Sequence, residues 1–130
     1  MPREKFHIEF VMGSASQASL WKMISKIDGL SQWFADEVEI SEDETKYIFH
    51  WGKSSNEAEV VYVRPQSNIR YRWMDEEDDQ YYFEFRIHKL ELSRELALQI
   101  TDFASPDEKG DAISLWEAQI DEMMRQLGVS

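Results

Sequence analysis

The sequence contains no cysteine, only three prolines and five glycines, and no long run of apolar residues. Without cysteine the chain has no disulfide, no thiolate metal site and no cysteine nucleophile, which fits a reducing cytoplasm. A membrane-spanning helix needs ~18 or more consecutive apolar residues. The first residues, Met-Pro-Arg-Glu-Lys, also lack the apolar core of a signal peptide. We therefore expect a single cytoplasmic domain over residues 1–130, without integral membrane association.

Basic side chains are scarce as well. There are 14 Lys and Arg against 26 Asp and Glu, which gives a formal net charge of −12. The deficit extends over both halves, because residues 1–65 carry 7 basic and 11 acidic groups and the remainder carries 7 and 15. Such a chain repels phosphates along its whole length, so we expect it not to bind nucleic acid or anionic lipid surfaces.

Aromatic residues, by contrast, are abundant: 5 Trp, 5 Tyr and 7 Phe, within a hydrophobic fraction of 42%. This composition excludes an intrinsically disordered chain. A chain of this length can also bury one hydrophobic core without help from disulfides or a structural metal.

The C-terminal segment has the spacing of one apolar helical face. Apolar residues recur there at intervals of three and four, which predicts a long amphipathic helix ending near Gly128. Ser105 and Glu108 have the spacing of a capping box, with Pro106 at the first helical position, although Gly110 could move the start to Asp111. The residues of the stripe are Ile113, Trp116, Ile120, Met123 and Leu127.

Upstream, alternating hydrophobicity predicts strands, and a helical pattern follows the first of them. Ser14 and Gln17 resemble a second capping box, Gly29 suits the end of that helix, and one more helical turn buries Trp33 and Phe34. A change of phase after His88 indicates a bulge near Lys89. The predicted strands are 5–12, 37–41, 46–51, 57–63, 68–74, 81–92 and 96–100.

This order predicts an α+β fold. Consecutive strands joined by short turns form a curved antiparallel sheet of about seven strands, whose apolar face the long C-terminal helix covers. Two short helices follow the first strand.

Three motifs carry a resemblance to a known family: Leu30-Ser-Gln-Trp-Phe-Ala-Asp-Glu-Val-Glu, Tyr71-Arg-Trp and Leu115-Trp116. With the element order, they make the chain resemble the START-like or Bet v 1-like (SRPBCC) superfamily, which has the helix-grip fold. It is most similar to small bacterial START-like domains related to activator-of-Hsp90-ATPase homologue 1-like proteins. The resemblance covers nearly the whole chain and implies a cavity between sheet and helix, which in many relatives binds a hydrophobic small molecule. Cyclases, lipid carriers and co-chaperone domains share the fold, so the fold alone selects no function.

The leading hypothesis is a non-enzymatic domain that binds a small hydrophobic molecule in this cavity. Large aromatic side chains would fill much of the space, so the cavity should be small, and Trp116 should decide whether it is open or plugged. No cofactor and no metal are expected. The residues expected to form the wall are Trp33, Phe49, Trp51, Tyr71, Trp73, Phe83, Phe85, Trp116, Ile120 and Met123.

A protein-interaction module is the second hypothesis, either a homodimer or a co-chaperone-like adaptor. It requires an exposed apolar patch, with Trp21, Val61, Leu90 and Leu92 as candidates.

The third hypothesis is an enzyme of the cyclase or hydrolase kind, which needs a polar side chain inside the cavity. The candidates for that side chain are His50, His88, Arg70 and Arg72. However, alternation places both arginines on the outer face, paired with strand glutamates such as Glu84. No Ser-His-Asp set or glycine-rich phosphate loop is present, and the acidic run 75–79 reads as a solvated connection.

Overall fold

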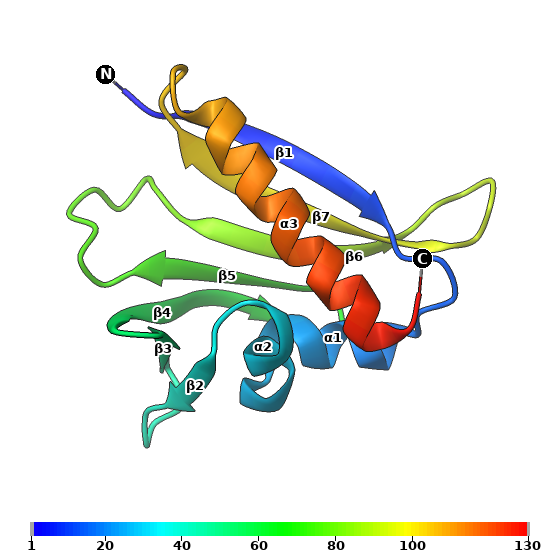
Figure 1. Ribbon diagram of the computed structural model, residues 1–130, viewed down its shortest axis with the longest axis horizontal. Coiled ribbons are helices and arrows are strands. Elements are labelled where there is room, and N and C mark those ends of the chain that lie inside the picture. The colour runs from blue at the N-terminus through cyan, green and yellow to red at the C-terminus, as the bar shows by residue number, and fades with distance from the viewer. Residues whose placement is uncertain (1, 130) are drawn as a thin grey trace.

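The computed structural model describes residues 2–129 as one sheet and three helices (Figure 1). The strands are antiparallel, in the spatial order β1-β7-β6-β5-β4-β3-β2. The elements are β1 (Glu4–Val11), α1 (Gln17–Ser25), α2 (Ile27–Trp33), β2 (Glu37–Ile40), β3 (Lys46–Trp51), β4 (Ser54–Arg64), β5 (Asn68–Trp73), β6 (Phe83–Lys89), β7 (Leu96–Ala104) and α3 (Lys109–Leu127).

Helix α3 runs diagonally across one face of the sheet, and α1 and α2 lie beside its C-terminal end (Figure 1). The predicted α+β helix-grip architecture is therefore confirmed, including the two short helices after the first strand. Its core lies between this face of the sheet and the three helices.

Alternation along the strands decides which side chains enter this core. In β6, Phe83, Phe85 and Ile87 are buried, whereas Glu84 on the other face binds Arg70, with 2.6 Å between Oε1 and Nε. The outward pairing predicted for Arg70 is thus confirmed. The phase change after His88 has a different cause from the predicted one, because β6 simply ends at Lys89.

The sheet does contain a bulge, but it lies in β4 between Val60 and Tyr62. The expected bulge near Lys89 is therefore wrong. Leu90 starts a hairpin loop, in which its N–H donates to the carbonyl of Glu95 at 2.9 Å, and Leu92 at the tip is fully exposed.

Both predicted capping boxes are wrong. Helix α1 is capped by Ser16, whose hydroxyl accepts the N–H of Ser19 at 3.1 Å, so Ser14 is not needed. At α3 the carbonyl of Ser105, not its side chain, accepts the N–H groups of Glu108 and Lys109, each at 3.0 Å. The left-handed stop at Gly128, with φ 74°, is confirmed.

The sequence predicted that Gly29 follows the first helix, and this prediction is wrong. The break falls at Lys26, where the backbone is extended, and Gly29 lies inside α2. A Cβ atom there would lie 2.0 Å from the carbonyl oxygen of Lys22 in α1. Only glycine therefore lets the two helices approach this closely.

The C-terminal end of α1 is capped by aromatic side chains from elsewhere in the chain. The last carbonyls of a helix have no partner within it, so buried ones need donors from outside. Here three inward-facing rings supply them: Trp33 Nε1 donates to Met23 O at 2.7 Å, Tyr71 OH to Ile24 O at 2.7 Å, and Tyr47 OH to Ser25 O.

Candidate functional site: an aromatic cavity at one end of the sheet

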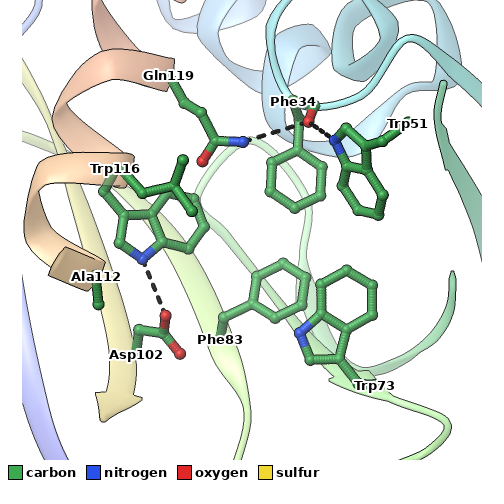
Figure 2. Close-up of a pocket in the computed structure, with 9 residues that line it drawn as sticks. Phe34, Trp51, Trp73, Phe83, Asp102, Ala112, Trp116 and Gln119 are labelled. Atoms are coloured by element: carbon green, nitrogen blue, oxygen red, sulfur yellow. Dashed lines mark hydrogen bonds between the residues drawn. The ribbon is translucent and has the colours of Figure 1, made fainter. Parts of the chain in front are cut away.

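A cavity of about 420 Å³ opens between the sheet and the first half of α3. The ring of Trp116 comes from α3, and the other four come from the chain after α2, the ends of β3 and β5, and the start of β6 (Figure 2). In an antiparallel sheet with this strand order, these positions all lie at one end. The nine lining residues are Phe34, Trp51, Trp73, Phe83, Asp102, Ala112, Leu115, Trp116 and Gln119.

Four of the ten residues expected to form the wall line this cavity, namely Trp51, Trp73, Phe83 and Trp116. The other six are buried in the packed core and do not line it. These six are Trp33, Phe49, Tyr71, Phe85, Ile120 and Met123.

Five lining residues were not among those expected. The position of most of them follows from helical spacing or strand alternation in the sequence. Ala112 and Gln119 lie four residues before and three after Trp116, so they share its helical face. Asp102 lies two residues beyond the predicted end of the strand. It is on the same inward face as Leu98 and Ile100, because β7 continues to Ala104. Phe34 was expected to be buried, and Leu115 precedes Trp116 at the rim, where it is 62% exposed.

Phe34 is the central ring of the wall. It stacks on Trp116 at a centroid distance of 6.0 Å and on Trp73 at 6.4 Å, and it meets Trp51 edge-on at 5.7 Å. Its carbonyl accepts the indole N–H of Trp51 at 2.7 Å and the amide of Gln119 at 3.3 Å. These contacts fix the rings, so the cavity is largely preformed.

Asp102 is the only titratable side chain among the nine. Its Oδ2 accepts the indole N–H of Trp116 at 2.9 Å (Figure 2). Its Oδ1 accepts the backbone N–H of Phe103 at 2.8 Å. Burial raises the pKa of the Asp102 carboxyl above its ordinary value, although both hydrogen bonds and the charge of Arg3 act in the opposite direction. The wall therefore combines five rings with one partly desolvated carboxyl.

The four candidate side chains that the enzyme hypothesis places inside the cavity lie outside it. His50 binds Glu39 at 2.7 Å, and His88 pairs with Glu9. Arg72 lies 3.5 Å from a carboxylate oxygen of Glu59 across the β4–β5 ladder. None of these three residues lines the cavity, and neither does Arg70.

Within residues 2–129, no three His, Cys, Asp or Glu side chains are grouped so that they could hold a metal ion. Over the same residues, no helix combines the length and the apolar character that crossing a membrane requires.

A curved antiparallel sheet closed over a long C-terminal helix, with a cavity between them, defines the helix-grip class. The family model of the START-like superfamily domain matches residues 1–129, so the chain belongs to this superfamily.

Solved structures agree. A Bacteroides fragilis protein, BfR322, is similar at 36% identity and a TM-score of 0.69, over 97% of this chain and 92% of that one. The Aha1 dimer from Colwellia psychrerythraea (12% identity, TM-score 0.72, 98% and 96% covered) and MLL2253 from Mesorhizobium loti (15%, 0.73, 95% and 96%) share the fold. A comparison with curated proteins found no match.

Proposed function

We propose that this protein is a non-enzymatic binding domain that holds a small, mainly apolar molecule in the cavity between its sheet and α3. The observation that supports this proposal is the cavity itself, about 420 Å³ with five aromatic rings in its wall. Ligand sites are commonly preformed, largely apolar clefts of about 300–1,000 Å³ with a few polar groups. The cavity has this size and this composition.

Intrinsic tryptophan fluorescence tests the proposal, because three of the five tryptophans line the cavity. Small neutral aromatics, fatty acids and sterols form the panel. We expect a saturable change in emission with the aromatics of a few fused rings. If no compound on this panel, and none of the ligands used below, changes the emission, the proposal is wrong.

Two substitutions on α3 locate the bound molecule. Ala112 lines the cavity and is half-buried, whereas Ala118 on the same helix is exposed and does not line it. Ala112→Phe should fill the cavity and abolish binding, while Ala118→Phe should leave it unchanged. Equal affinities for the two variants would place the ligand elsewhere on the protein.

A protein-interaction role is the second proposal, and an exposed stretch of β4 favours it. Val61, Tyr62 and Val63 are 45%, 49% and 47% exposed. They lie beyond Glu59, the last β4 residue that pairs with β3, so this part of β4 is a sheet edge. Exposed apolar edges favour association with another chain.

The Aha1 relative from Colwellia psychrerythraea is a dimer, which supports a homodimer as the first partner to test. Sedimentation over a range of concentrations should then show a dimer that Val61→Lys weakens. A monomer at every concentration would rule out the proposed homodimer. Of the other expected patch residues, Trp21 is buried, Leu90 is half-buried, and Leu92 is exposed in the loop between β6 and β7.

The enzyme hypothesis is not part of the proposal. It required His50, His88, Arg70 or Arg72 to point into the cavity, and none of the four lines it.

A further inference from the structure

The charge of the cavity wall has one sign. Among the nine lining residues Asp102 is the only one that can carry a charge, and no Lys, Arg or His lies with it. Arg3, whose charge lowers the pKa of Asp102, is already paired with other side chains. Its guanidinium lies 2.7 Å from a carboxylate oxygen of Glu76 and 3.9 Å from the ring centroid of Tyr81. A ligand with its own carboxylate would therefore meet a negative wall without a counter-charge.

The rings of the wall have the complementary property. The indole N–H groups of Trp51 and Trp116 are both consumed by hydrogen bonds within the protein. What these side chains offer a ligand is thus mainly their π-systems, whose faces are negative. A cation within about 6 Å of such a face is attracted to it, most strongly by Trp, and the attraction grows when water is excluded.

Acidic groups outside the wall act in the same direction, and the nearby cations Arg3 and Arg72 both contact Glu76. The acidic run 75–79 begins two residues after Trp73, which itself lines the cavity. The net charge of the chain is −12. A cleft of low dielectric lined by one sign of charge concentrates ions of the other sign.

We propose that the cavity selects a small organic cation, an amine or quaternary ammonium attached to an apolar group, over neutral and anionic molecules of the same shape. Asp102 is the counter-charge, and the rings of Trp51, Trp73 and Trp116 surround the apolar part and the cationic head. This inference rests on the proposed function, since it names the chemical class of ligand for the same cavity.

Three ligands that share a benzyl group, two of them isosteric, separate this inference from the proposed function. Benzyltrimethylammonium is the cation, neopentylbenzene is its uncharged isostere in which carbon replaces nitrogen, and phenylacetate is the anion. Their dissociation constants follow from NMR titrations of the tryptophan indole N–H signals. We expect the cation to bind at least ~10-fold more tightly than the isostere, since a charge-assisted contact and cation–π attraction are both added, and phenylacetate to bind most weakly.

Equal affinities for the cation and its isostere would overturn the selection for cations and leave the proposed function intact. Failure of the two charged ligands to bind up to millimolar concentration, and of neopentylbenzene up to its solubility limit, would overturn the selection and count against the proposed function as well. Tighter binding of phenylacetate would overturn the assigned charge preference alone.

Asp102→Asn tests the counter-charge directly, because it keeps an oxygen that accepts a hydrogen bond. It should weaken binding of the cation ~10-fold and leave the isostere unchanged. The control is Asp121→Asn, which removes one charge from an exposed position of α3 that does not line the cavity. Equal losses in the two variants would assign the effect to net charge and overturn the role of Asp102.

The wild-type protein supplies an independent measurement if Asp102→Asn folds poorly. A bound cation should lower the pKa of the Asp102 carboxyl, because binding and ionisation favour each other reciprocally. Carbon-detected NMR titration with and without benzyltrimethylammonium reports this change. An unchanged pKa at saturation would overturn the proposal.

Discussion

At the scale of single residues, Gly29 marks a close approach between α1 and α2. A Cβ atom at this position would lie 2.0 Å from Lys22 O and 2.7 Å from Met23 Cα, both backbone atoms that cannot rotate away. Gly29→Ala should therefore force α2 from α1 and lower the free energy of unfolding by at least about 2 kcal/mol. Urea denaturation measures the change.

Gly110 provides the matched control. It lies in the first turn of α3, and a Cβ atom added there meets nothing within 4 Å. Gly110→Ala should stabilise the protein by up to about 1 kcal/mol, because alanine is the better helix former and restricts the unfolded chain. Similar destabilisation by both substitutions would contradict the close approach at Gly29.

Asp102 should make stability fall as pH rises. Burial raises the pKa of its carboxyl in the folded state above the ordinary value of 3.8, so between these two values the unfolded chain loses a proton that the folded protein retains. Its favourable contribution is therefore complete below pH 3.8 and is lost as the pH rises through the folded-state pKa. The difference in unfolding free energy, Asp102→Asn minus wild type, should rise across this window and then level off.

A second carboxylate, that of Asp43, should give stability the opposite dependence on pH, and it serves as the control. The hydroxyls of Ser41 and Thr45 lower the pKa of Asp43 to about 2. Its contribution is present above pH 3.8 and is lost as the pH falls toward this lower value. The corresponding difference for Asp43→Asn should therefore grow more negative with rising pH. Parallel curves for the two variants would contradict the assigned environment of Asp102.

At the scale of elements, the attachment of α1 to the sheet depends on buried hydrogen bonds. Tyr71 is fully buried, and burial raises its pKa well above the ordinary value, so it remains a neutral donor to Ile24 O. Tyr71→Phe leaves that carbonyl without its donor and should cost about 1–3 kcal/mol. Urea denaturation again measures the loss.

Tyr62 is the matched control, since it is 49% exposed on β4. Tyr62→Phe should change stability by less than about 0.5 kcal/mol. A loss for Tyr71→Phe no greater than for Tyr62→Phe would show that the bond to Ile24 contributes nothing.

Most strands were predictable from the sequence because they carry three or more alternating apolar residues, so one ambiguous position does not change the pattern. The helix starts were not. Ser14-x-x-Gln17 and Ser16-x-x-Ser19 overlap within the same loop, and the sequence cannot rank two such short patterns before the chain is folded.

The cavity wall was predictable only in part, for a related reason. Alternation shows which side chains face inward, but it does not show which of them another element covers. On β3, β5 and β6, the inward residue at the open end lines the cavity, and the inward residue two positions further along the strand belongs to the core. The pairs are Trp51 and Phe49 on β3, Trp73 and Tyr71 on β5, and Phe83 and Phe85 on β6.

At the scale of the whole molecule, net charge should dominate the response to salt. A charge of −12 repels itself in the folded state, and salt screens this repulsion. Salt also weakens attractive pairs such as Arg125–Glu122, but exposed pairs of this kind contribute only about 0–1 kcal/mol each. The thermal midpoint should therefore rise as sodium chloride is added from low ionic strength. A falling midpoint would show that the ion pairs outweigh the repulsion.

The arrangement of rings in two successive layers has a consequence for the ligand site proposed above. The inner layer, which includes Phe49 and Phe85, lies directly behind the cavity wall, because Phe49 packs against Phe34 and Phe85 against Trp116. Replacing one of these rings by a smaller apolar side chain would deepen the cavity along the strands, at a cost of up to about 5 kcal/mol for alanine. The length of the molecule that fits would then change in steps set by side-chain size. The backbone, the mouth and the carboxyl of Asp102 would stay where they are, so ligand length and ligand charge could evolve separately.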